Sequence, residues 1–246
     1  SEESQMLPID QKVRAGILDN GLKYFIKCNS QEKGKASTRL ILRVGSVNET
    51  ENEQGLAHFV QLMNFRGTSH FPSGTITSFL DSIGAKVKKE ESSETCYEVS
   101  LHTYYDKTTY RINIPVDDPN NMKKVLTLYS DWVGGRSLMT PPEVEEERGI
   151  LLQKWLFSRD SRRRYHDHRW EVMLEDTAYA NRPPYGSEDV IRNCTYQDVR
   201  TFYHRWYQPN MAAVVVIGDV DVDQVEQQII DEFSSIQSST SFIQEP

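Results

Sequence analysis

Apolar positions follow two different spacings along the chain, and the order of these spacings predicts the order of the secondary-structure elements. Apolar residues at every second position, or in one unbroken run, predict strands at residues 22–27, 38–44, 87–103, 109–114 and 211–217. Apolar residues three or four positions apart predict helices at residues 55–65, 73–83, 120–133, 140–173, 187–192, 195–206 and 221–233. Because the strands and helices do not alternate regularly, we expect an α+β fold rather than a doubly wound parallel sheet.

Two segments carry more specific local signals. Thr140–Glu143 combines a threonine cap, prolines in the first turn and an acid near the positive end of the helix dipole, which predicts a helix start. We expect that helix to continue past Trp155 to the region of Met173. The last strand, Met211–Ile217, is apolar at every position, which predicts burial on both of its faces.

The order of the predicted elements favours a single domain. The chain has 246 residues, of which 37% are hydrophobic, which is enough for one large core or two small ones, so length alone does not decide. We expect the domain at residues 15–235, between an N-terminal tail (1–14) and a linker-like C-terminal tail (236–246) rich in Ser and Gln. No apolar run approaches the roughly 20 residues of a membrane-spanning helix, so no transmembrane segment is expected.

The net charge bears on the class of partner. A formal charge of −8 argues against nucleic acid, because binding to phosphates needs a basic surface. The three cysteines, Cys28, Cys96 and Cys194, form no CxxC pair and predict no disulfide framework.

Two local charge clusters each allow two interpretations. The acids of Glu143–Glu147 could form a metal-binding patch, but acids in a first helical turn more commonly stabilise the helix dipole. The segment Arg159–Arg169 contains five arginines and two histidines, which could receive an acidic peptide or a phosphate group. The alternative is a solvated helix face whose charge offsets the acids.

The most informative segment is Gly55–Thr68, with the sequence GLAHFVQLMNFRGT. It resembles the zinc-binding helix of the insulinase-type peptidases (family M16, with pitrilysin and the mitochondrial processing peptidase), whose usual form is G-x-A-H-F-x-E-H-M-x-F-x-G-T. In that family two histidines on one helix face bind zinc, and the intervening glutamate activates the metal-bound water. The resemblance extends in order over residues 15–235, through the segments 17–24, 80–85, 147–155 and 203–219.

The functional positions depart from the family's pattern. The resemblance places the zinc ligands at His58, Leu62 and Lys154 and the catalytic base at Gln61. A leucine has no lone pair, an ammonium group has only donors, and an amide is not a base. We therefore expect no catalytic residue, no metal ligand set and no cofactor, and His58 to be a structural, partly buried histidine.

Glu147 is a further site-lining candidate, because it matches the first glutamate of the family's E-R-x-V-I-x-x-E helix. One hypothesis is that the charge of Lys154 replaces the missing metal ion and holds Glu147 or other polar groups. The alternative is that Lys154 extends into solvent.

The resemblance also implies a fold and partners. The expected fold is a single α+β domain (LuxS/MPP-like) with a mainly antiparallel sheet of about five or six strands and helices packed on one face. Active members pair such domains, which implies a second M16-type domain or subunit. The family also binds extended peptides by adding them to a sheet edge.

From these features we expect a non-catalytic homologue that binds a peptide or a partner subunit, or that braces an active M16 half. One alternative is a zinc-dependent endopeptidase whose site is rebuilt from His58 and acids such as Glu147, or completed by another chain. A second alternative is a purely structural subunit of a hetero-oligomer. The stretches ERGxxxxxW and GDxDVDxxE resemble those of exported bacterial members, which favours the bacterial envelope or periplasm.

Overall fold

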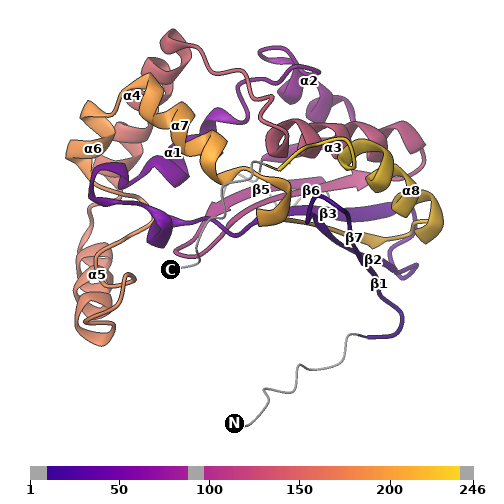
Figure 1. The fold of residues 1–246 in the computed structure, drawn as a ribbon, viewed down its shortest axis with the longest axis horizontal. Helices are drawn as coiled ribbons and strands as arrows, with labels where there is room; N and C mark the ends of the chain where they lie inside the picture. Colours follow the sequence, from indigo (N-terminus) through magenta and orange to yellow (C-terminus); the bar gives the residue numbers. More distant parts are fainter. Residues whose placement is uncertain (1–9, 88–96, 239–246) are drawn as a thin grey trace.

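A mixed β-sheet forms the centre of the molecule, and this computed structural model describes residues 10–87 and 97–238 of the chain (Figure 1). Within those residues the sheet has seven strands in the order β1-β2-β7-β3-β6-β5-β4. The strands are β1 (Arg14–Ile17), β2 (Lys23–Cys28), β3 (Lys35–Leu42), β4 (Ala85–Val87), β5 (Tyr97–Thr103), β6 (Thr108–Pro115) and β7 (Ala212–Gly218). Two neighbouring pairs, β2–β7 and β4–β5, are parallel and the other four are antiparallel.

This arrangement confirms the α+β fold with a mainly antiparallel sheet. The sheet is larger than the expected five or six strands because two short strands, β1 and β4, extend its two edges. The single strand expected at residues 87–103 is present as β4 and β5, and residues 88–96 of that expectation lie outside the described residues.

Eight α-helices lie in the described part of the chain. They are α1 (Leu56–Met63), α2 (Thr75–Ser82), α3 (Pro119–Val133), α4 (Pro141–Phe157), α5 (Ser161–Met173), α6 (Glu188–Asn193), α7 (Tyr196–Trp206) and α8 (Val222–Phe233). None of the helices within residues 10–87 and 97–238 combines the length and the apolar character that a membrane span needs.

The helix start at Thr140 is confirmed, but the expected length of that helix is wrong. The Thr140 hydroxyl accepts a hydrogen bond from the Glu143 backbone N–H, and the Glu143 carboxylate accepts one from the Thr140 N–H. The helix ends at Phe157, and α5 begins separately at Ser161. The break has a local cause, because the Asp160 carboxylate accepts a hydrogen bond from the Arg163 N–H at 2.8 Å and caps a new helix.

Helices cover one face of the sheet, and the core lies between the two layers (Figure 1). Leu40, Tyr110 and Val214 are register partners on β3, β6 and β7, and all three side chains are fully buried. The next positions on each strand point to the other face. Burial of β7 on both faces was therefore a wrong expectation: Val216 is fully buried, whereas Ile217 is 41% exposed, because the helix layer of the described residues covers only the first face.

The start of α1 is held by close backbone packing and by a buried carboxyl group. Gly55 and Gly186 both have positive φ angles, and a Cβ atom on Gly186 would lie 2.3 Å from the Gly55 Cα. The two carboxyl oxygens of Glu49 accept hydrogen bonds from the backbone N–H groups of Gly55 (2.9 Å) and Ala57 (2.8 Å). These contacts fix where the motif helix begins.

The end of α1 is fixed by a buried polar network around Asn64. The Asn64 amide donates to the Tyr110 hydroxyl at 2.8 Å, and its carbonyl oxygen accepts from the Ser137 hydroxyl at 2.7 Å. The Trp132 indole N–H donates to the Asn64 backbone carbonyl. The motif helix is thus tied to the sheet and to α3, and its side chains have fixed positions.

The expected tails lie partly outside the described residues. Strand β1 begins at Arg14, and residues 1–9 and 239–246 are not described. The side chain of Ile236 is buried, and the Asn20 amide donates to the carbonyls of Phe233 and Ile236.

Candidate functional site

Helices α1 and α4 bring together the positions at which the family binds zinc. His58 and Leu62 lie four residues apart on α1 and so share one face of the helix. Lys154 on α4 is near enough for its charge to act on His58. Burial, and then the charge of Lys154, lower the pKa of His58 to about 4, so its imidazole is neutral at physiological pH.

Gln61, at the position of the catalytic base, faces the sheet. Its side chain is only 2% exposed, and its amide oxygen accepts a hydrogen bond from the Thr103 hydroxyl at 3.1 Å. Its amide nitrogen is buried without a hydrogen-bond partner among the residues that the structure describes. An amide group can donate and accept hydrogen bonds, but it cannot take a proton from water.

Glu147 is held by Arg66, and the hypothesis that Lys154 holds it is wrong. The Glu147 carboxylate is nearly fully buried and accepts hydrogen bonds from two nitrogens of the Arg66 guanidinium, at 2.8 and 2.6 Å. A third nitrogen of Arg66 lies 3.1 Å from the carboxylate of Glu146. Arg66 is the third residue after the end of α1, and its planar guanidinium reaches α4. The side chain of Lys154 is exposed, as the alternative hypothesis expected.

The acids at the start of α4 are accounted for by helix capping and ion pairs. Glu143 completes the cap at Thr140, and Glu145 pairs with Arg148 at 2.9 Å. Glu146 and Glu147 both pair with Arg66. This arrangement supports the helix-stabilising interpretation of the acidic segment over the metal-binding one.

The side chains at the family's zinc positions do not fit a catalytic zinc ion. Such an ion takes three protein ligands and a water molecule. Of the three ligand positions only His58 offers a lone pair, because Leu62 is apolar and the Lys154 ammonium has only donors. Over residues 10–87 and 97–238 there is also no group of three His, Cys, Asp or Glu side chains with a geometry that could hold a metal ion.

Two residues that position this site, Arg66 and Glu49, were not singled out from the sequence. Arg66 occupies a position that the family pattern leaves open, so nothing in the motif indicated its pairing with Glu147. Glu49 lies in a polar segment that reads as a loop, and only the fold brings its carboxylate to the start of α1. The one sequence feature that could have indicated this contact is the acidic residue six positions before Gly55.

We expect Arg66→Met to lower the free energy of unfolding by about 2 kcal/mol, because the buried Glu147 carboxylate would lose its charge partner. The matched control is Glu146→Gln, which removes the exposed partner of the same arginine and should cost less than about 0.5 kcal/mol. Urea unfolding of the two variants measures both effects. Equal losses would show that the stability of the Glu147 environment does not depend on Arg66.

Comparison with known proteins places these features in one family. Residues 24–185, well over half of the chain, match the family model described as insulinase (peptidase family M16). Residues 193–246 match a second model, described as the peptidase M16 inactive domain, and none of the site positions discussed above lies in that segment.

The relatives are much longer than this chain. A protein of Escherichia coli named as probable zinc protease PqqL is 32% identical over 230 residues, which is 94% of this chain and 24% of the relative. A zinc protease PQQL-like protein of Arabidopsis thaliana is 33% identical over 204 residues, 83% of this chain and 20% of the relative. The chain therefore spans about a quarter or less of the length of these relatives.

Solved structures show the same similarity in three dimensions. The periplasmic protease PqqL from Escherichia coli superimposes with a TM-score of 0.88 at 31% identity, covering 98% of this chain and 26% of that protein. The ferredoxin protease FusC, solved in complex with Arabidopsis ferredoxin, gives a TM-score of 0.82 at 26% identity, covering 95% of this chain and 25% of that protein. From its matching family model, its relatives and its fold, the chain belongs to the insulinase family of peptidases, family M16.

Proposed function

We propose that this chain is a non-catalytic M16 domain that binds a peptide or a partner subunit, or braces an active M16 half. The observation that supports this most is the chemistry of the four family positions on α1 and α4. Two of three ligand positions carry Leu62 and Lys154, and the base position carries a buried amide, Gln61, hydrogen-bonded to Thr103. A zinc-activated water has neither a ligand set nor a base there.

The competing proposal is a zinc-dependent endopeptidase with a rebuilt site. It is favoured by the relatives, which are named as a probable zinc protease and a zinc protease-like protein, and by the retained His58, whose imidazole is neutral and so has a free lone pair. Against it stands Glu147, the acid named for such a site, because its carboxylate is already paired with Arg66. A site completed by another chain would have to supply at least two ligands.

Partners and location belong to the same proposal. Because the chain matches about a quarter of PqqL, we propose a second M16-type domain as its neighbour, in the same protein or in another subunit. Extended peptides could add to the sheet at its edge strand β4 through backbone hydrogen bonds, which need no metal. A bacterial envelope or periplasmic location is supported by the description of E. coli PqqL as a periplasmic protease.

Zinc content tests the proposal. The 246-residue chain, purified without chelators and then incubated with zinc, should contain close to no zinc by elemental analysis. It should also leave a quenched-fluorescence peptide library uncut. About one tightly bound zinc ion per chain, lost in a His58→Ala variant and accompanied by peptide cleavage, would establish the competing proposal instead.

A further inference from the structure

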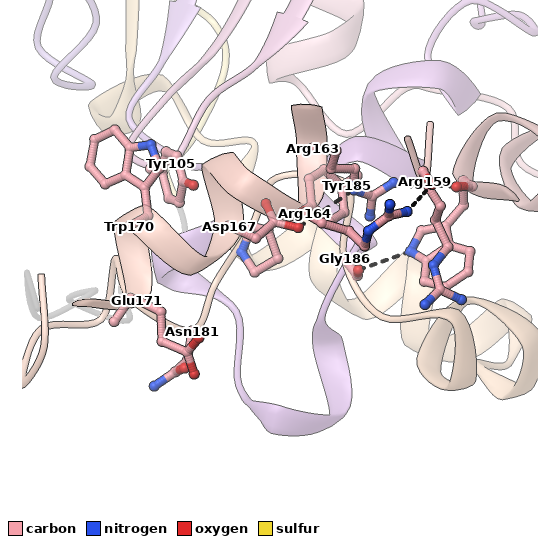
Figure 2. A pocket seen from close by; sticks show the side chains of 13 residues that line it. Tyr105, Arg159, Arg163, Arg164, Asp167, Trp170, Glu171, Asn181, Tyr185 and Gly186 are labelled. Carbon is pink, nitrogen blue, oxygen red and sulfur yellow. Dashed lines mark hydrogen bonds and ion pairs between the residues drawn. The ribbon is translucent and has the colours of Figure 1, made fainter. Parts of the chain in front are cut away.

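A cavity of about 360 Å³ lies between α5, the end of α4, the β5–β6 turn and residues 180–186. None of the site positions on α1 or α4 discussed above lines it. Figure 2 shows that its two ends differ, with Tyr105 and Trp170 together at one end and Arg159, Arg163 and Arg164 toward the other. Its volume is within the range of ligand sites in proteins and is large enough for one or two amino-acid side chains.

The aromatic end is preformed. The rings of Tyr105 and Trp170 lie 5.2 Å apart with an interplanar angle of 31°, and the ring of Tyr179 lies 5.7 Å from that of Tyr105. The indole N–H of Trp170 donates to His166 at 2.8 Å, which fixes the orientation of the ring. A third aromatic or aliphatic side chain can pack against these rings without any rearrangement.

The cationic end has guanidinium groups that are not neutralised within the described residues. Arg163 is occupied, because it lies over the rings of Trp155 and Tyr185, donates to the Trp155 carbonyl and is 3.8 Å from the Asp167 carboxylate. Arg159 lies over the Trp155 ring at 4.8 Å, and Arg164 donates to the Arg159 backbone carbonyl at 3.2 Å, but neither guanidinium has an ion pair in the described part of the chain. Two arginines are thus available to bind a carboxylate.

The helix that forms one wall has no buried residue. All thirteen residues of α5 are exposed or half-buried, and Figure 1 shows the helix projecting from the body of the molecule. Tyr165, Val172 and Met173 on α5 are each more than 60% exposed. A helix with exposed apolar side chains and a cavity along one side is suited to contact another chain.

We propose that this cavity binds an acidic peptide segment in which an aromatic residue lies close to a glutamate or aspartate. The acid would pair with Arg159 and Arg164, and the aromatic ring would pack against Tyr105 and Trp170. A phosphate group is disfavoured, because Asp167 and Glu171 also line the cavity and would repel a dianion, whereas they can accept peptide N–H groups. The cavity offers a local positive surface in a chain whose net charge is −8. This inference does not depend on whether the chain is catalytic.

Fluorescence anisotropy tests the proposal, with a labelled peptide in which one phenylalanine is flanked by glutamates. The full 246-residue chain should bind it, with weaker binding at higher salt. The double variant Arg159→Glu/Arg164→Glu should weaken binding by at least about tenfold. The matched control is Arg162→Glu, an exposed arginine of the same helix that does not line the cavity, and it should change the affinity by less than about threefold.

Further probes distinguish the named chemistry from a general charge effect. A peptide with alanine in place of phenylalanine should bind more weakly, and binding of the parent peptide should change the fluorescence of Trp170, identified by its loss in Trp170→Phe. The proposal would be overturned by equal losses in the double variant and the control. It would also be overturned if inorganic phosphate binds in an Arg159- and Arg164-dependent way while the peptide does not.

Discussion

The triple variant Gln61→Glu/Leu62→His/Lys154→Glu should bind about one zinc ion per chain, whereas the parent chain should bind none tightly. The variant restores two histidines four residues apart on α1 and a carboxylate on α4 facing them. The fold already places these positions together, since the charge of Lys154 acts on His58. Zinc affinity should rise by at least about a thousandfold, or about 4 kcal/mol, well below the 10–16 kcal/mol or so of a complete structural site.

Isothermal titration with zinc and elemental analysis measure this gain. Two controls separate the ligands from the base: Leu62→His alone restores only a two-histidine pair and should bind zinc weakly, and Gln61→Glu alone should not bind it. A triple variant that is folded by circular dichroism but takes up no zinc would show that α1 and α4 no longer hold the family's ligand geometry. In that case the loss of the site would lie in the backbone as well as in the side chains.

The motif helix could be predicted because its signals are local. The apolar positions of Gly55–Thr68 and the cap at Thr140 depend on residues within one or two turns, and both helices begin where the sequence indicated. The division between α4 and α5 could not be predicted from periodicity. It arises because Asp160 caps the start of a new helix instead of continuing α4. The edge strands β1 and β4 are short, and they form because each pairs with a neighbouring strand, β1 with β2 and β4 with β5.

Only part of the candidate site could be predicted from the sequence, for a related reason. Which family positions had changed could be read directly from Gln61, Leu62 and Lys154. The side chains that surround these positions could not be predicted from the sequence, because the pairing of Arg66 with Glu147 joins residues that are 81 positions apart. Likewise, the arginine-rich segment alone did not indicate a cavity. The cavity depends on the fold, which places Tyr105, from a distant turn, beside Trp170.

The free energy of unfolding of the chain should fall between pH 4.5 and pH 8 through Glu49, and a Glu49→Gln variant should lack this component. Burial raises the pKa of Glu49 to about 8, and the hydrogen bonds from the N–H groups of Ala57 and Gly55 oppose the shift only in part. Between pH 4.5 and 8 the folded chain keeps a proton on Glu49 that the unfolded chain has released. Stability is therefore full below pH 4.5 and falls as the pH rises, by up to about 1.4 kcal/mol per pH unit, until the folded carboxyl also ionises near pH 8.

Urea unfolding of the parent and the variant at several pH values isolates this contribution, because every other titrating group is common to both. The glutamine should cost about 1 kcal/mol at low pH, since its amide nitrogen cannot accept one of the two N–H groups at the start of α1. Because the parent loses up to about 1.4 kcal/mol per pH unit, the variant should lose this disadvantage within about one pH unit above pH 4.5 and be the more stable chain from there to pH 8. The control Glu51→Gln removes an exposed acid whose pKa is lowered by Arg182, so it should show no such crossing in this window. A difference between parent and variant that stays constant from pH 4.5 to 8 would mean that Glu49 is ionised throughout. The two backbone N–H groups at the start of the motif helix would then outweigh the cost of burying its charge.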